Sequence, residues 1–206
     1  MNHTFKIILA CTGVFILQKL LGQLFFENFA LIQETVLLKP WMVVSALFLH
    51  GDFSHLLLNM VSLAIFGSIL EHVIGRRRFL YVFFGTGILA NIISVPFYTA
   101  ALGASGAILG IMGTLAVLRP QLVLYVYFFP MRLWFAVILY AVIDIFGIFI
   151  PNGVGNIAHL AGLVVGLFIG WHYLKTYGKK RARYQPIRME DAVLDRWEDQ
   201  YMQHRR

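Results

Sequence analysis

The sequence predicts an all-α, polytopic membrane protein, and three observations lead to that fold class. Hydrophobic residues make up 59% of the 206 residues and charged residues only 13%, well below the share in a soluble domain. Long apolar runs recur along the chain, as expected of membrane-spanning helices. The net charge of +7 gathers at the ends of these runs, which favours a membrane surface and not nucleic acid as the neighbour of the basic residues.

Six apolar runs predict six membrane-spanning helices. The first run lacks the small-residue cleavage site of a signal peptide, so we expect it to be retained. The single cysteine, Cys11, excludes a disulfide within the chain. We place the six spans at 5–25, 52–74, 79–98, 105–118, 133–150 and 156–176.

Basic residues predict the orientation of the bundle. They lie at the beginnings of the first and fifth spans and at the ends of the second, fourth and sixth, whereas the first long loop carries only Lys39 and the connections 99–104 and 151–155 carry none. Because cytoplasmic connections are rich in lysine and arginine, both termini are expected in the cytoplasm. The residues concerned are Lys6, Arg76, Arg77, Arg78, Arg119, Arg132, Lys175, Lys179, Lys180, Arg181 and Arg183.

Three segments lie outside the predicted spans. Residues 26–50 are too mixed to span and are expected in the outer membrane interface, and residues 120–131 are expected to form an interfacial loop on the cytoplasmic side. Residues 1–176 thus form one membrane domain, followed by a basic cytoplasmic tail at 177–206. A four-residue spacing in the tail favours a short amphipathic helix through Met189, Val193, Trp197 and Tyr201.

Polar residues cluster at the beginnings of the second, fourth and sixth spans. His55 and Asn59 begin the second, Ser105 begins the fourth, and Asn156 and His159 begin the sixth. All three spans run inward from the outer face, so these residues should share one depth in the membrane. Intramembrane polar residues are costly and usually face the bundle interior, which makes this group a candidate functional site.

Ser105 has two interpretations, a packing residue between helices or a nucleophile. The fourth span has 14 residues before Arg119 and covers only ~21 Å, against ~30 Å for the hydrocarbon core. Ser105 should therefore lie about 10 Å below the outer surface, in a water-accessible cavity. The preceding Gly103 allows close approach of a backbone.

A serine nucleophile needs a base within hydrogen-bond reach, and His159 is the candidate. No carboxylate is expected near this histidine, so the sequence predicts a Ser–His dyad and not a triad. Asp144 in the fifth span is the only acid available, and an interhelical hydrogen bond explains it better than catalysis does.

An acyl-transfer reaction also needs donors for the oxyanion. The backbone amide of Ser105 lies at a helix N-terminus and supplies one. His55 and Asn59 are four residues apart, so they share a helix face and can point to the same centre. The alternative is that these two side chains bond to each other within the bundle.

Three motifs together resemble the rhomboid family of intramembrane serine proteases. They are HGDFSHLLLNM at 50–60, GASG at 103–106 and NIAHLAGLVVG at 156–166. The resemblance covers about residues 5–176. The GASG segment differs from the soluble-hydrolase elbow G-x-S-x-G because Ala107 replaces the last glycine.

The resemblance implies a six-helix, metal-free and cofactor-free endopeptidase. Its nucleophile would be Ser105, its general base His159, and its oxyanion hole His55, Asn59 and the Ser105 amide. Substrates would be transmembrane or membrane-adjacent segments of other proteins, cut near the outer face after local unwinding. The fifth span and the connection 151–155 would form a gate. Supporting residues would be His50, Gly103, Gly106, Asn156, Gly162 and Gly166.

Two positions depart from the family pattern. Met42 follows Trp41 where an arginine is often found, which puts a stabilised outer loop in doubt. Leu109 replaces an aromatic residue that often packs under the histidine, so packing alone is expected to hold His159.

Two other function classes compete with the protease, a non-catalytic rhomboid-like membrane adaptor and a small transporter. An adaptor would be expected to lack Ser105 or His159, and both are present. A transporter would show inverted repeats and broken helices, and neither is seen. The expected location is a prokaryotic inner membrane, with the site open to the outer face.

Overall fold

A computed structural model describes residues 2–126, 129–150 and 153–181. The chain divides into two compact units, residues 1–174 and residues 175–206. All elements discussed below belong to the first unit, and the described part of the second consists of the last turns of α9. The predicted tail helix through Met189 and Trp197 lies outside the described residues.

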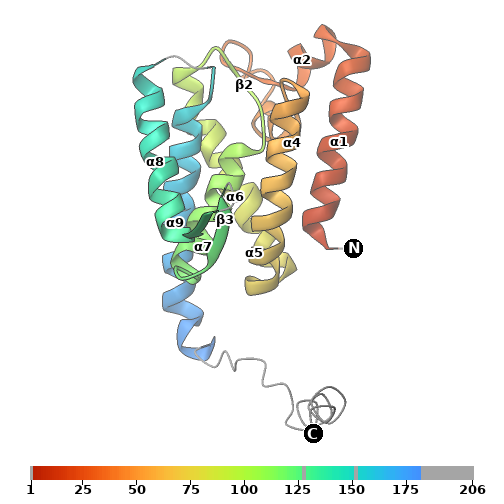
Figure 1. Ribbon diagram of the computed structural model, residues 1–206. Helices are drawn as coiled ribbons and strands as arrows, with labels where there is room; N and C mark the ends of the chain where they lie inside the picture. The colour runs from red at the N-terminus through yellow and green to blue at the C-terminus, as the bar shows by residue number, and fades with distance from the viewer. Residues whose placement is uncertain (1, 127–128, 151–152, 182–206) are drawn as a thin grey trace, which may run out of the picture. The chain divides into compact units, whose positions relative to one another are not determined.

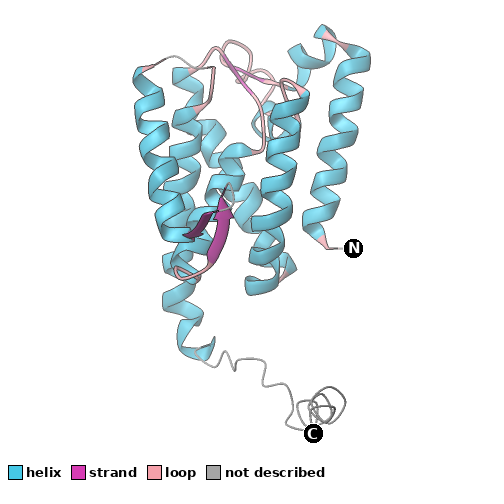
Figure 2. Ribbon diagram, in the orientation of Figure 1, coloured by secondary structure: helices cyan, strands magenta, loops and turns pink. Residues whose placement is uncertain are grey.

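Helices dominate the described residues, and the strands are short (Figures 1 and 2). The segments α4, η2 and α5 form one continuous helix with a π-helical turn at η2. The elements are α1 (His3–Leu21), α2 (Gln23–Phe29), β1 (Leu31–Ile32), α3 (Met42–Ser45), η1 (Ala46–Phe48), α4 (Phe53–Ser62), η2 (Leu63–Gly67), α5 (Ser68–Ile74), α6 (Arg76–Ser94), η3 (Val95–Phe97), β2 (Ala100–Ala101), α7 (Ser105–Leu118), β3 (Val123–Val126), β4 (Phe129–Arg132), α8 (Leu133–Phe149) and α9 (Asn156–Arg181).

Each of the six predicted spans coincides with a helical segment. Four segments among the described residues are long and apolar enough to cross a membrane, namely His3–Leu21, Phe53–Ile74, Arg76–Phe97 and Asn156–Thr176. The other two, α7 and α8, are shorter apolar helices. The helix α7 has the bounds predicted for the fourth span, 105–118, and that it spans the membrane stays a prediction.

Two predicted span boundaries were wrong, and glycines explain both. The first span ends at Leu21 and not at residue 25, because Gly22 adopts φ +61° and breaks the helix. The third begins at Arg76 and not at residue 79, because Gly75 (φ +86°) ends α5 and leads directly into α6. Positive φ is accessible to glycine without steric cost.

Helix α7 is the central helix of the bundle, and residues 106–116 are all buried. Its small residues allow close contact with α9. A Cβ added to Gly162 would collide with the carbonyl oxygen of Gly106, and one added to Gly166 would collide with that of Gly110. Such close approach is typical of glycines between membrane helices.

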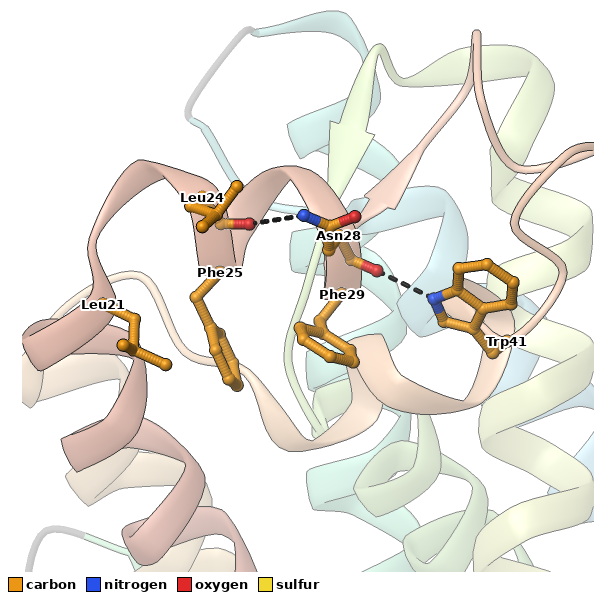
Figure 3. A pocket seen from close by; sticks show the side chains of 6 residues that line it. All are labelled: Leu21, Leu24, Phe25, Asn28, Phe29 and Trp41. Carbon is orange, nitrogen blue, oxygen red and sulfur yellow. Dashed lines mark hydrogen bonds between the residues drawn. The ribbon is translucent and has the colours of Figure 1, made fainter.

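The outer loop between α1 and α4 is folded and not merely apolar. Strands β1 and β2 pair antiparallel, with Leu31 opposite Ala101. The indole of Trp41 donates to the carbonyl of Asn28 at 2.8 Å (Figure 3). The ammonium of Lys39 donates to the Asn28 side chain at 2.9 Å. Lys39 and Trp41 thus tie this loop to α2, next to the position where Met42 stands in place of an arginine.

Apolar side chains of the same loop remain exposed beside Trp41. The Trp41 side chain, the end of α1 and the side chains of α2 together line a shallow cavity (Figure 3). Exposed aromatic and leucine side chains are expected where a protein faces the membrane interface, and the placement of residues 26–50 there stays a prediction. The lining residues are Leu21, Leu24, Phe25, Asn28, Phe29 and Trp41.

The connection before α8 contains a β-hairpin, so the prediction of a loop over residues 120–131 was incomplete. Strands β3 and β4 pair antiparallel, with Val123 opposite Arg132. Pairing satisfies backbone groups that a membrane surface would otherwise leave without partners.

Candidate active site

The candidate site forms where α7 begins, below the level at which α4 and α9 begin. Figure 1 shows the chain descending from β2 into the bundle before α7 starts. Ser105 is the first residue of α7, and His159 lies in the first turn of α9. The two side chains meet, with Nε2 of His159 2.7 Å from Oγ of Ser105.

A third side chain joins this pair from α8. Oδ1 of Asp144 lies 3.0 Å from Nδ1 of His159, the ring nitrogen that does not contact Ser105. The expectations that no carboxylate reaches His159 and that packing alone holds it were therefore wrong. Asp144 does make an interhelical hydrogen bond, as predicted, and its partner is His159. Leu109, at the position where the family often has an aromatic residue, is buried in the apolar core.

The ring of His55 lies over Gly103, next to Ser105. Gly103 has φ +119°, and a Cβ there would stand 2.9 Å from Nε2 of His55 and 3.8 Å from Oγ of Ser105. Only glycine therefore leaves room for the imidazole. The backbone N–H of Gly51 donates to Nδ1 of His55 at 3.4 Å, so in the neutral ring the hydrogen is on Nε2, towards Gly103.

Asn59 follows His55 by one turn of α4 and is buried. Its amide nitrogen donates to the backbone carbonyl of His55 at 2.8 Å. This bond uses one of the two N–H groups of the amide. The two side chains thus share a helix face as predicted, and Asn59 bonds to the backbone of His55 and not to its ring.

Asp52 caps the helix that carries His55. Its carboxylate accepts the backbone N–H of His55 at 2.8 Å and the hydroxyl of Ser54 at 2.5 Å. The hydroxyl of Ser54 first, and then the His55 amide, lower the pKa of this exposed carboxyl below its ordinary value. An ionised cap at an N-terminus is favourable both as acceptor and as charge.

His50 is buried directly before α4, behind His55. Its ring lies edge-on to the His55 ring with centroids 5.1 Å apart, and its Nδ1 is 3.3 Å from the carbonyl oxygen of Phe48. Two bonds to Gln18 of α1 hold its backbone, at 2.9 Å to the His50 carbonyl and 3.2 Å from the His50 amide. No pattern in the sequence singles out Gln18.

Burial lowers the pKa of His50 to about 4, and repulsion from His55 acts in the same direction. Between pH 6.5 and 4 the unfolded chain binds a proton that the folded protein excludes. Stability is therefore fully present above pH 6.5 and should fall by up to about 3 kcal/mol as the pH drops towards 4. Thermal unfolding in detergent at pH 7.5, 5.5 and 4.5 measures this loss.

The matched variant for this pH dependence is His50→Gln, which cannot titrate. Its unfolding temperature should be lower at neutral pH but should change less between pH 6.5 and 4.5 than that of the unsubstituted protein. Parallel curves for the two proteins would show that His50 does not cause the acid destabilisation.

The remaining predicted residues frame the site. Asn156 begins α9, and its amide donates to the carbonyl of Val154 at 3.1 Å. A Cβ at Gly147 of α8 would stand 2.5 Å from the Asn156 side chain, so these two helices touch here. Gly106 lies against the carbonyl of Ala158, so that a Cβ added to Gly106 would stand 3.3 Å from the carbonyl oxygen.

Tyr98 was not predicted as a residue of the site. Its hydroxyl accepts the backbone N–H of Ile157 at 3.0 Å and so caps α9.

No three histidine, cysteine, aspartate or glutamate side chains cluster as metal ligands among the described residues. A metal-free and cofactor-free site stays a prediction. The arrangement that is present, a hydroxyl bonded to an imidazole at a helix N-terminus, is suited to nucleophilic catalysis.

Comparison with known proteins gives consistent matches. The family model described as Rhomboid domain matches residues 38–176. The chain is 31% identical over 150 residues to the putative rhomboid protease YdcA of Bacillus subtilis, covering 70% of this chain and 71% of that protein. It is 28% identical over 170 residues to the mitochondrial Rhomboid protein 1 of Saccharomyces cerevisiae, covering 77% of this chain and 49% of that protein.

A third relative is the rhomboid protease GluP of Bacillus subtilis, 32% identical over 136 residues. That match covers 62% of this chain and 25% of GluP. The chain thus spans most of one relative and half or less of the other two.

Proposed function

This chain belongs to the rhomboid family, and from that premise we propose that it is an intramembrane serine endopeptidase. It is an integral, multi-pass membrane protein, and relatives named as proteases support the reaction class. The observation that carries the proposal is the 2.7 Å contact between Ser105 and His159 at the beginning of α7.

In the proposed reaction, Oγ of Ser105 attacks the scissile carbonyl carbon and its proton passes to Nε2 of His159. The tetrahedral intermediate collapses as the imidazolium gives that proton to the leaving nitrogen, which breaks the C–N bond and leaves an acyl-enzyme. Water, deprotonated by His159, then releases the carboxylic acid and regenerates Ser105.

The proposed oxyanion donors are the backbone amide of Ser105 in α7 and the side chains of His55 and Asn59 in α4. The Ser105 amide belongs to the first turn of α7, where N–H groups lack helical acceptors. The hydrogen on Nε2 of His55 points towards Gly103, and the second N–H of Asn59 lies one turn deeper on the same face. Donors aimed at a developing charge act strongly in a site from which bulk water is restricted.

The proposed substrates are transmembrane segments of other proteins. A segment must unwind locally before cleavage, because a hydrogen-bonded helix shields its carbonyl groups. Six spans with both termini in the cytoplasm would open the site to the outer face, as the basic residues predict. The relatives include bacterial and mitochondrial proteins, so the prokaryotic inner membrane stays a prediction.

Labelling with a fluorophosphonate separates a protease from the adaptor and transporter alternatives. We expect a single label, mapped to Ser105 by mass spectrometry, together with cleavage of a single-span substrate in liposomes. The matched control is Ser94→Ala, because the Ser94 hydroxyl only donates to the Asn91 carbonyl within α6 and should not affect either readout. A folded protein that neither labels nor cleaves would support the adaptor.

A further inference from the structure

We propose that Asp144 is a positioning residue that orients His159 from α8, so that the base is complete only while the outer half of α8 lies against α9. This inference rests on the proposed protease function. It adds Asp144 as a third residue to the Ser105–His159 pair, and it gives α8, the helix that carries Asp144, a role in orienting the general base.

The contact geometry supports positioning. Asp144 and Ser105 bond to opposite nitrogens of one ring, at 3.0 Å and 2.7 Å. An ionised carboxylate can only accept, so the hydrogen of the neutral ring must be on Nδ1. Nε2 then presents its lone pair to the Ser105 hydroxyl, which is the tautomer that a general base requires.

Burial singles out Asp144 among its neighbours on α8. The side chains on either side of it, Ile143 and Ile145, are 54% and 48% exposed, whereas Asp144 is 5% exposed. A carboxylate in a membrane helix is costly unless it is paired. His159 is the partner that the structure provides, so the bond also favours one rotation of α8 about its axis.

The packing of α8 is uneven along its length. The buried apolar residues of this helix, Leu133, Ala136 and Val137, all lie in its first two turns. Beyond them, Asp144 is the remaining buried side chain of α8, and Gly147 touches Asn156 of α9. The outer half of α8 is therefore held to α9 by polar contacts more than by apolar packing.

This arrangement couples the position of α8 to the state of His159. A displacement of the outer half of α8 away from α9 would break the Asp144–His159 bond. His159 would keep its contact with Ser105 but lose the carboxylate that fixes its tautomer. The general base would be complete again only when Asp144 contacts Nδ1 of His159.

The test compares Asp144→Asn with Thr114→Val, a matched loss of an interhelical hydrogen bond away from His159. The Thr114 hydroxyl lies 2.9 Å from the carbonyl oxygens of both Gly110 in α7 and Gly166 in α9, and it joins the two helices when it donates its one hydrogen to Gly166. For Asp144→Asn we expect kcat on a liposome substrate and the fluorophosphonate labelling rate to fall together, at least about 100-fold, with KM changed less than about threefold. Thr114→Val should lower the unfolding temperature and leave both rates unchanged.

Nitrogen-15 NMR of histidine-labelled protein gives a readout that needs no substrate. In the unsubstituted protein, His159 should be the Nδ1–H tautomer, and in Asp144→Asn the Nε2–H tautomer should become populated. This measurement on the unsubstituted protein tests the proposal even if the variant fails to fold.

Three outcomes would overturn the proposal. The first is unchanged kcat and labelling in folded Asp144→Asn, and the second is faster cleavage with unchanged labelling, which would make Asp144 only a latch. The third is an Nε2–H tautomer in the unsubstituted protein. If the unsubstituted protein neither cleaves nor labels, the protease function itself fails and this inference fails with it.

Discussion

Replacing Ser105 or His159 with alanine should each lower kcat at least about 10,000-fold, and replacing both should lower it little further. The reason is that Oγ of Ser105 and Nε2 of His159 share one proton across 2.7 Å, so neither group works without the other. Independent contributions would instead multiply. Cleavage of a single-span substrate in liposomes, measured for both single variants and the double variant, tests this non-additivity.

Folding of these variants is checked by thermal unfolding in detergent, because both residues are part of tightly packed helices. Ser105→Ala should unfold close to the temperature of the unsubstituted protein, whereas the two variants that carry His159→Ala leave the buried Asp144 carboxylate without its partner and should unfold cooperatively at a lower temperature. A Ser105→Ala variant that still cleaves at the normal rate would refute the nucleophile assignment. A double variant that is far slower than either single variant would refute the paired action.

Replacing Gly162 with alanine should destabilise the folded protein by about 3 kcal/mol or more, a large effect for one methyl group. The added Cβ would collide with the carbonyl oxygen of Gly106, which is backbone and cannot rotate away. Helices α7 and α9 would have to separate, which would also pull His159 away from Ser105. Unfolding in detergent and the labelling rate measure the two consequences.

The matched control is Gly85→Ala on α6, since an added Cβ there meets no atom within 4 Å. This substitution should leave stability unchanged or raise it slightly, because alanine restricts the unfolded chain more than glycine does. Equal effects of Gly85→Ala and Gly162→Ala would show that helix propensity, and not the close approach of α7 and α9, controls the result.

The pairing of Ser105 with His159 could be predicted because depth in a membrane follows from counting along the chain. Each residue lies near the beginning of a predicted span, and the structure brings the two side chains together. Their separation of 54 residues was no obstacle, since the predicted direction of each span also predicts the level at which the span begins.

The Asp144 contact could have been anticipated in part. The predicted fifth span ends at residue 150, so Asp144 lies six residues, or ~9 Å, from its outer end, close to the ~10 Å expected for Ser105. Depth alone does not say which way the side chain points. The rotation of α8 that aims Asp144 at His159 depends on contacts with α7, α9 and β4.

The parts of the fold that could be predicted from the sequence alone are those that depend on residues close together in the chain. Apolar length located the helices, and the motifs at 50–60, 103–106 and 156–166 located the candidate site, because both are properties of short segments. Contacts between segments needed the tertiary structure. Gln18 beside His50, Tyr98 on the first turn of α9 and Lys39 beside Asn28 leave no periodic pattern, since each depends on distances between elements that only the packed bundle sets.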